Sequence, residues 1–357
     1  MLNKLLKLHR RIALQGAKCL SEWLLFLLLL PFSVLYGWIG LVRNYCYDCQ
    51  ILSSNGAEVP VVSVGNLAVG GTGKTPVVDW LLKEFLRQGK NPAVVSRGYG
   101  GNFAAEVGVV CAGEGPLLDA DEAGDEPNLL ARRNPQIIAL IARKRAAGVQ
   151  AAIEQFRADV VILDDGFQHR AVRRNLDLVL LDATHPCGNR WPLPAGLLRE
   201  FPSALGRADM LLLTRADEGS SFQFADKPVF TSKHQLSDYA VDLTGKQIDF
   251  RELQGLNLCA FAGISDPAGF FDALRDAGLQ LADCLPLGDH CNYDQKTLQR
   301  VQMSAGGCDA LLTTEKDAVK LSDELFSIPC YQVPMTIVID AEESFKSQLQ
   351  NRLWSNE

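Results

Sequence analysis

Short apolar runs alternate with helical patterns along most of this chain. The first run, Val59–Val64, is rich in β-branched residues, and apolar residues then recur at helical spacing over Val77–Leu82. Further runs with the length of a buried strand lie at Pro92–Ser96, Glu106–Cys111, Pro135–Ile141, Val160–Leu163, Leu176–Leu181 and Met210–Leu213. Continuous runs of this kind are typical of parallel strands that are covered on both faces. The pattern predicts an α/β fold in which a parallel sheet carries helices on both faces.

The pattern changes in the last third of the chain. Residues Asp226–Gln247 are polar and extended, as in a hinge between domains, and a second series of strand and helix signals follows. Strands are predicted at Leu256–Gly263 and Asp309–Thr313, with a helix over Phe270–Ala277 between them. We therefore predict three parts: an N-terminal membrane-anchor helix region at 1–50, an α/β core at 51–235 and a smaller C-terminal α/β domain at 236–357.

The N-terminal part contains an apolar segment that is long enough to associate with a membrane. Trp23–Val42 has no charged residue, and about 20 helical residues span the hydrocarbon core of a bilayer. Aromatic side chains within it suit the membrane interface. A buried core helix is the alternative. A cleaved signal peptide fits poorly, because the leading region is long and no small-x-small cleavage site follows.

The charges around this segment argue against a simple span. Five basic residues precede it, and only Arg43 closely follows it, so the positive-inside rule keeps the N-terminus in the cytoplasm. A full crossing would then place the rest of the chain outside. We therefore predict a helix that lies in the inner leaflet or only partly enters it, with Pro31 breaking or kinking it and both flanks cytoplasmic.

Composition narrows the class of protein further. A hydrophobic content of 47% and a charged content of 22% are those of a globular protein, and the net charge of −7 gives no support for nucleic acid as a partner. The ten cysteines are scattered. Only Cys46 and Cys49 have C-x-x-C spacing, and no second pair completes a zinc site. We read the cysteines as reduced thiols in a cytosolic compartment.

A phosphate-binding loop is predicted between the first apolar run and the helical pattern after it. Gly70–Thr75 reads G-G-T-G-K-T, and its glycines let backbone N–H groups converge on phosphate oxygens at a helix start. Lys74 is expected to bridge the outer phosphates, and the Thr75 hydroxyl to bind Mg²⁺. The strict motif has glycine where this chain has Ala68, so the match is to a distinct branch of P-loop proteins. An ordinary glycine-rich turn is the alternative.

Charged residues follow other predicted strands. Asp164 and Asp165 end the run Val160–Leu163, and a carboxylate at a strand end can hold Mg²⁺ directly or through water. Two adjacent aspartates are costly without a cation, which favours a metal nearby. Arg97 follows the second strand and Arg199 lies in a proline-rich loop. Both are candidate contacts for phosphate, although spacing alone does not separate them from solvated loop arginines.

Two further polar groups are ambiguous from spacing alone. Gly124–Pro127 has the composition of a turn that leads into a helix. The carboxylates of Asp125 and Glu126 are therefore expected to be held in place rather than freely solvated. His290 lies in a turn beside an aspartate, where an uninvolved loop histidine is the simpler explanation.

Together these motifs resemble one family closely, the tetraacyldisaccharide 4'-kinases (lipid A 4'-kinases) of Gram-negative bacteria. The resemblance covers most of the chain in one order, and several of the matching stretches are six or more residues long, which makes it specific. They are Gly65-Asn66, Gly70–Pro76, Ser96–Gly100, Gly124–Pro127, Asp164–His169, Leu193–Glu200, Asp289-His290 and Thr314–Lys320, which reads T-E-K-D-A-V-K.

The resemblance implies an enzyme of lipid A biosynthesis. Such an enzyme transfers the γ-phosphoryl group of ATP, with Mg²⁺, to the 4'-hydroxyl of a tetraacylated glucosamine disaccharide 1-phosphate and forms lipid IVA. Residues 51–235 would then be a P-loop kinase core, joined by a hinge to the smaller domain. The implied location is the cytoplasmic face of the inner membrane, where the lipid substrate lies. We expect a monomer.

The resemblance also assigns roles to individual residues. Asp125 would be the general base, assisted by His290, and Asp165 or its neighbour Asp164 would handle Mg²⁺ and position the phosphates. The predicted catalytic residues are Asp125, His290, Asp165 and Lys74. Those predicted to bind ATP are Asn66, Gly70, Gly71, Thr72, Gly73, Lys74 and Thr75. Substrate or phosphate contacts are expected from Arg97, Glu126, Gln168 and Arg199, and metal contacts from Thr75, Asp164 and Asp165.

Two other classes of protein remain open at this point. One is a membrane-tethered regulatory ATPase or GTPase of the same P-loop branch, which uses a lysine before the double glycine where this chain has Val69. The other is a module that binds nucleotide without chemistry, for which Asp125 and His290 are dispensable. One departure from the family pattern is Cys291, where many relatives carry histidine or glutamine, and it leaves the surroundings of His290 undetermined.

Overall fold

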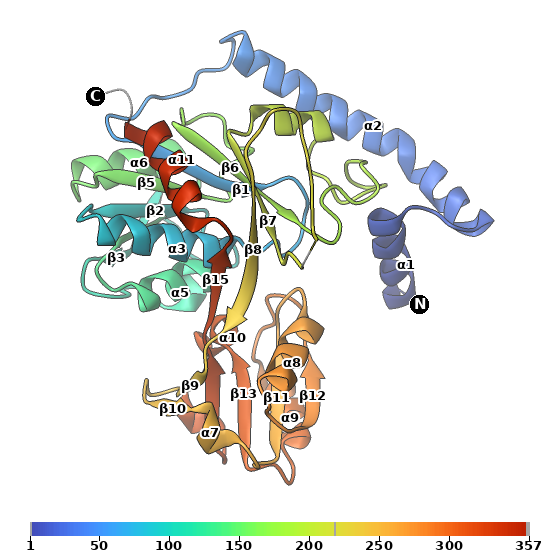
Figure 1. Ribbon diagram of the computed structural model, residues 1–357, viewed down its shortest axis with the longest axis vertical. Helices are drawn as coiled ribbons and strands as arrows, with labels where there is room; N and C mark the ends of the chain where they lie inside the picture. The colour runs from blue at the N-terminus through green and yellow to red at the C-terminus, as the bar shows by residue number, and fades with distance from the viewer. Residues whose placement is uncertain (1, 218, 355–357) are drawn as a thin grey trace.

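The computed structural model describes residues 2–217 and 219–354 and places them in two α/β units and an N-terminal pair of helices (Figure 1). The larger unit is built on one sheet. Its strands are β1 (Val61–Asn66), β2 (Pro92–Ser96), β3 (Val107–Ala112), β4 (Ile138–Ala142), β5 (Val160–Asp164), β6 (Leu176–Asp182), β7 (Met210–Thr214), β8 (Val229–Leu236) and β15 (Met335–Ile339).

The order of these strands places β1 near the middle of the sheet. The nine-stranded sheet runs β15-β8-β7-β6-β1-β5-β2-β4-β3, and every strand from β8 to β4 in this order is parallel to its neighbours. Only the edge strands β15 and β3 pair antiparallel. The central strands are fully buried because helices cover both faces. The predicted parallel sheet is confirmed.

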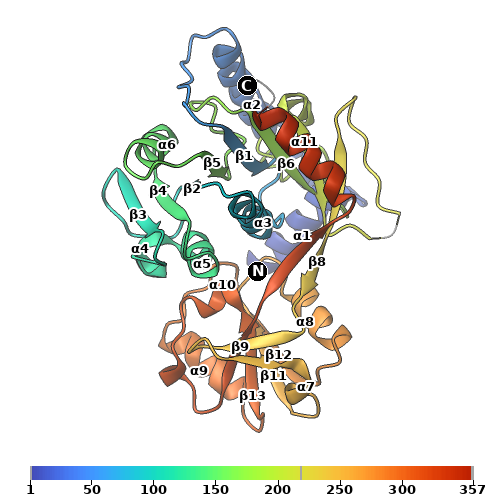
Figure 2. The same cartoon turned by 60° about the vertical axis from the view of Figure 1, so that its left-hand side comes forward.

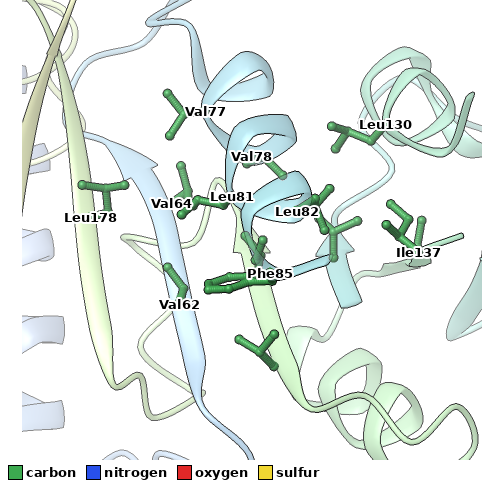
Figure 3. Packing of buried hydrophobic residues seen from close by; sticks show 14 of the residues in the cluster. Val62, Val64, Val77, Val78, Leu81, Leu82, Phe85, Leu130, Ile137 and Leu178 are labelled. Atoms are coloured by element: carbon green, nitrogen blue, oxygen red, sulfur yellow. The ribbon is translucent and has the colours of Figure 1, made fainter. Parts of the chain in front are cut away.

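Helices α3 (Lys74–Arg87), α4 (Ala120–Ala123), α5 (Asp125–Arg133) and α11 (Glu342–Trp354) belong to one face, and α6 (Arg145–Glu154) covers the other. Helix α3 illustrates how the spacing of apolar residues leads to this packing. Its buried residues Val77, Leu81 and Phe85 recur at helical spacing, and Figure 3 shows Leu81 beside Val64 and Phe85 beside Val62 of β1. This packing holds the N-terminus of α3 at the carboxyl end of β1.

The smaller unit is a second sheet of six strands. Its strands are β9 (Tyr239–Asp242), β10 (Gln247–Asp249), β11 (Leu258–Ala262), β12 (Leu281–Pro286), β13 (Ala310–Thr314) and β14 (Cys330–Val333), in the order β10-β9-β14-β13-β11-β12. Its helices are α7 (Phe250–Leu253), α8 (Pro267–Asp276), α9 (Gln295–Ser304) and α10 (Glu315–Ala318). Figure 2 shows this unit below the edge of the large sheet from which β8 and β15 project.

The chain passes between the two units twice, which changes the predicted domain limits. It leaves the large sheet after β8, where the predicted boundary at 235/236 falls, and it returns between β14 and β15. Residues 335–354 therefore belong to the large unit, and the predicted range 236–357 is wrong at its C-terminal end. The reason is the antiparallel pairing of β15 with β8, which brings Phe345 and Leu349 of α11 into the large core.

The polar stretch Asp226–Gln247, predicted as an extended hinge, contains β8 and β9, with the crossover between the two units at Ser237-Asp238. The large and small sheets are thus connected by two adjacent segments, the β8–β9 crossover and Pro334. Short 3₁₀ helices occur at Pro202–Arg207 and Asp323–Leu325.

The N-terminal helices are α1 (Leu2–Gln15) and α2 (Leu20–Asp48). Pro31 lies inside α2 and does not end it, so the predicted break is absent. By length and composition α2 could cross a membrane, and only 11% of its most apolar window is buried. The alternative of a buried core helix therefore fails. Most of its large apolar side chains face outward, among them Leu24, Leu27, Leu28, Phe32, Leu35, Trp38 and Ile39.

Candidate active site

The loop between β1 and α3 has the geometry of a phosphate-binding loop. Gly73 is the N-cap of α3 in a left-handed conformation, with φ 74°, and a Cβ there would lie 2.6 Å from Nε2 of His234. The amide of Asn66 donates to the Thr72 hydroxyl at 3.0 Å and to the carbonyl of Ala68 at 2.6 Å. The loop is therefore tied to the end of β1, with the positive end of α3 directed at it.

Lys74 and Arg199 converge on one carboxylate, that of Asp165. The Lys74 Nζ lies 3.5 Å from Asp165 Oδ1, and Arg199 Nη1 donates to both carboxylate oxygens at 2.9 and 2.8 Å. The same Nη1 lies 3.3 Å from Oε1 of Gln168. Burial alone raises the pKa of Asp165, but Lys74 and Arg199 outweigh it and lower the pKa. Asp165 is thus a carboxylate with two cations beside it at the end of β5.

Asp164 is the buried member of the aspartate pair. The Ser96 hydroxyl donates to its Oδ2 at 3.0 Å, whereas Oδ1 is buried and has no hydrogen-bond partner within the part of the chain that the structure describes. Burial, with the nearby charge of Glu126, raises the pKa of Asp164 to about 6. An orphaned carboxylate oxygen fits a cation or the water shell of one.

The side chains around Asp164 do not form a complete set of metal ligands by themselves. Among residues 2–217 and 219–354, no group of three or more His, Cys, Asp and Glu side chains is arranged to hold a metal ion. A cation at Asp164 and Thr75 would therefore complete its coordination with water and phosphate oxygens, which is the usual situation of Mg²⁺ beside a nucleotide.

Asp125, at the start of α5, is contacted by two side chains of the small unit. The Lys320 Nζ lies 2.7 Å from its Oδ2, and His290 Nδ1 lies 3.2 Å from the same oxygen. Burial alone raises the pKa of Asp125, but the hydrogen bonds from His290 and Lys320 outweigh it and lower the pKa. Asp125 is therefore held as a buried carboxylate by residues more than 150 positions away in the sequence.

A second cation of the small unit lies beside this group. The Lys316 Nζ is 3.2 Å from Nε2 of His290, 3.3 Å from Oδ1 of Asp289 and 3.5 Å from Oε1 of Glu126. The backbone of His290 is left-handed, with φ 54°, and its ring packs edge-on against Tyr99 at 5.6 Å between centroids. The imidazole is thus enclosed on several sides by α10, α5 and the loop after β2.

One cleft of about 1070 Å³ joins these groups. Nearly all of the predicted site residues line it, including Lys74, Thr75, Arg97, Glu126, Asp164, Asp165, Gln168, Arg199 and His290. Asn66 and Asp125 lie just behind its wall and contact lining residues. Tyr36, Ile39 and Arg43 of α2 line the same cleft, so the exposed apolar helix and the phosphate-binding loop face one space.

Several charged residues of the cleft were not predicted from the sequence. Lys316 lines the cleft and Lys320 contacts Asp125 behind its wall. Both belong to the stretch Thr314–Lys320 that carried part of the family resemblance, but no role was assigned to either. Arg215 donates to the carbonyl of Gly71 and lies 3.3 Å from Asp266 of the small unit. His234 had no signal, because it lies in the stretch that was predicted only as an extended hinge.

Comparison with known proteins gives one consistent result. The family model for tetraacyldisaccharide-1-P 4'-kinase matches residues 25–354. A tetraacyldisaccharide 4'-kinase from Syntrophotalea carbinolica is 49% identical over 94% of this chain and 95% of its own length. Kinases of the same name from Pelobacter propionicus and Geobacter sulfurreducens are 40% and 41% identical, over 87% and 82% of this chain and 88% and 83% of their own.

A solved structure is similar over nearly the whole chain. LpxK from Aquifex aeolicus, crystallised in complex with ATP, superposes with a TM-score of 0.78 at 32% identity and covers 91% of this chain and 98% of its own. None of these comparisons supports the alternative of a regulatory ATPase or GTPase.

Proposed function

This chain belongs to the tetraacyldisaccharide-1-P 4'-kinase family, and we propose that it phosphorylates the 4'-hydroxyl of a tetraacylated glucosamine disaccharide 1-phosphate. The phosphoryl group is the γ-phosphoryl of ATP, and the product is lipid IVA, a step of lipid A biosynthesis. One observation supports this assignment above the others: the phosphate-binding loop, His290 and residues of the apolar helix α2 line a single cleft, and the buried Asp125 contacts His290 just behind its wall.

The phosphates of ATP are assigned to the loop Gly70–Thr75. Backbone N–H groups at the start of α3 and the Lys74 ammonium neutralise charge on the transferring phosphoryl group, which is the main requirement of this chemistry. Arg199 and Arg97 supply further positive charge on the same wall of the cleft. Asp165 contacts both Lys74 and Arg199, so one carboxylate orients the two cations.

We assign Mg²⁺ to Thr75 and the Asp164-Asp165 pair. When bound, the ion neutralises charge on the phosphate oxygens. The orphaned Oδ1 of Asp164 is the observation that supports this placement.

Asp125 is assigned as the general base. It is a buried carboxylate with a lowered pKa, so it is ionised at neutral pH and can accept the proton of the sugar hydroxyl. As the hydroxyl oxygen bonds to the γ-phosphorus, the bond from that phosphorus to the β–γ bridging oxygen breaks and ADP leaves. The hydroxyl proton passes to Asp125, which Lys320 and His290 hold in place.

The membrane surface is assigned to α1 and α2. The outward apolar side chains of α2 suit lipid, and basic residues of α1 suit anionic headgroups. Because ATP and the phosphate loop must share one compartment, we assign the enzyme to the cytoplasmic face of the inner membrane. We propose that it acts there as a monomer.

A transfer assay tests the assignment. Purified full-length protein in detergent micelles receives γ-labelled ATP, Mg²⁺ and the disaccharide 1-phosphate lipid, and label is followed into lipid. Wild type should transfer label, Lys74→Ala should abolish transfer, and Asp125→Asn should lower it by about 10²–10⁴-fold.

The controls separate the possible outcomes. Asp226→Asn and Lys246→Ala remove the same charges at exposed positions and should leave transfer unchanged. Transfer that survives Asp125→Asn moves the base to another residue but keeps the kinase. ATP hydrolysis without transfer by wild type contradicts the proposed substrate.

A further inference from the structure

The His290 ring has a hydrogen-bonding partner at each nitrogen. Nδ1 faces Oδ2 of Asp125 at 3.2 Å, and Nε2 faces the Nζ of Lys316 at 3.2 Å. A neutral imidazole carries one proton, so one ring nitrogen donates and the other accepts. The identity of the two partners therefore decides the tautomer.

Lys316 can only donate. A lysine ammonium has three donors and no acceptor, and this one is held as a cation. Burial alone lowers the pKa of Lys316, but the carboxylates of Glu126 and Asp289 outweigh it and raise the pKa. Nε2 of His290 must then be the acceptor, which leaves the single proton on Nδ1, where it is donated to Asp125. A second proton on Nε2 would point at the ammonium group and is opposed by its charge.

We propose that Lys316 is a positioning residue that holds His290 as the neutral Nδ1–H tautomer and so leaves Asp125 as the only group able to take the proton of the substrate hydroxyl. The inference rests on the proposed function for its catalytic consequence, but the tautomer itself does not depend on it. In this arrangement His290 orients the base and does not remove the proton.

The two carboxylate oxygens of Asp125 also differ in their contacts. Lys320 and His290 both contact Oδ2, and neither of them occupies Oδ1. Oδ1 is then the atom that accepts the proton when the substrate O–H bond breaks and the new O–P bond forms. The two contacts from the small unit both hold Oδ2, so neither of these cationic or donor groups competes with the substrate hydroxyl for Oδ1.

The charges around His290 come from every element packed against it. They are Asp125 and Glu126 from α5, Asp289 from its own loop, Lys316 from α10 and Lys320 just after it, and the uncharged ring of Tyr99 completes the enclosure. Of these, only the Lys316 ammonium lies against Nε2 at hydrogen-bonding distance. Without that cation, no group at hydrogen-bonding distance among the described residues would oblige Nε2 to act as the acceptor.

The first test observes the tautomer directly. Full-length protein with ¹⁵N-labelled histidine is studied by NMR in detergent micelles at neutral pH, and His290→Gln identifies the signals of His290. We expect a protonated, pyrrole-type Nδ1 and an unprotonated, pyridine-type Nε2. A proton on Nε2, whether in the other tautomer or in imidazolium, overturns the proposal, and the result holds whatever the substrate proves to be.

The second test is the pH profile of Lys316→Gln. The glutamine keeps a hydrogen-bonding group but removes the charge, so Nε2 of His290 no longer faces a group that can only donate. We expect kcat near pH 7 to fall about ten-fold and to recover on raising the pH, because only a loss that depends on an added proton is reversed at higher pH.

The controls are chosen to exclude a structural explanation. Lys246→Gln, an exposed residue of the small unit, should keep the wild-type profile, and Lys316→Arg, which is still a donor-only cation, should keep its acid limb in place. A loss in Lys316→Gln that is equal at every pH overturns the proposal. Absence of lipid transfer in wild type would contradict the proposed function instead, and would leave the NMR result standing.

Discussion

At the scale of single residues, the phosphate loop is notable for the histidine packed against it. His234 of β8 lies against Gly73, and its Nε2 is buried with no hydrogen-bond partner among the described residues. Burial, with the nearby charge of Arg215, lowers the pKa of His234 to about 4. A cation at this position would face the same loop that binds phosphate, yet the fold keeps this imidazole neutral.

This lowered pKa predicts a loss of stability in mild acid. In the unfolded chain a histidine takes up its proton near pH 6.5, whereas folded His234 does so only near pH 4. Between these values the unfolded state binds more protons, so its contribution makes the free energy of unfolding fall as the pH falls. We expect His234→Gln to remove roughly 1–2 kcal/mol of the loss between pH 7.5 and pH 5.

Urea unfolding of wild type and variant at the two pH values checks this. His169, whose pKa burial also lowers to about 4, acts in the same direction and remains in both proteins, so the variant should still lose some stability in acid. An equal difference between wild type and variant at pH 7.5 and pH 5 would contradict the assignment of His234 as a buried neutral histidine.

At the scale of elements, one arginine ties together the helices and strands that form the site. Arg133 ends α5, the helix that begins with Asp125. Its Nη1 donates to Asp79 of α3 at 3.0 Å, its Nε donates to Glu315 of α10 at 2.9 Å, and its Nη2 donates to the carbonyl of Met335 in β15 at 2.8 Å. Both carboxylates are largely buried. The guanidinium therefore links the phosphate-loop helix, the base helix and the small unit.

We expect Arg133→Gln to cost about 3–5 kcal/mol of unfolding free energy, because it leaves the buried Glu315 without a cation and Asp79 with Lys83 as its only cation among the described residues. The neighbouring Arg132 is exposed, so Arg132→Gln is a matched control expected to change stability by less than about 1 kcal/mol. Chemical denaturation of the full-length protein in micelles measures both. Equal effects of the two substitutions would show that the link formed by Arg133 does not hold the elements together.

At the scale of the whole molecule, two units share one cleft and a pair of helices borders it. Most large apolar side chains of α2 are exposed, and Tyr36, Ile39 and Arg43 of the same helix also line the cleft. One helix therefore contributes both to the cleft and to an exposed apolar surface, which suits a substrate with a polar headgroup and acyl chains. Exposed basic residues of α1, including Lys7 and Arg10, add attraction for anionic lipid.

Removing two of these charges should weaken binding to anionic membranes selectively. We expect the double variant Lys7→Gln/Arg10→Gln to lose about 2 kcal/mol of binding free energy, roughly thirty-fold in affinity, to vesicles rich in phosphatidylglycerol. Binding to phosphatidylcholine vesicles, which depends on the apolar face of α2, should not change. Co-sedimentation measures both, with the exposed pair Lys246→Gln/Lys296→Gln as the control. An equal loss on both vesicle types would argue against an electrostatic role for α1.

The sequence by itself determined the elements and much of the chemistry of this protein. Apolar runs of strand length, the glycine-rich loop before Lys74 and the aspartates at the end of β5 are local patterns. A local pattern can be recognised in the sequence because it depends only on which residues of one segment are buried and on which backbone conformations glycine allows. The same motifs also carried the family resemblance.

The tertiary structure alone decided which distant segments meet. The return of β15 to the large sheet depends on which edge strand was left open, and no local period encodes that choice. The enclosure of His290 by Lys316 and Asp125 likewise depends on how the two units pack, across 165 positions in the case of Asp125. The family resemblance indicated that Asp125 and His290 were candidates, but the contacts of His290 with Asp125 and Lys316 exist only in the folded chain.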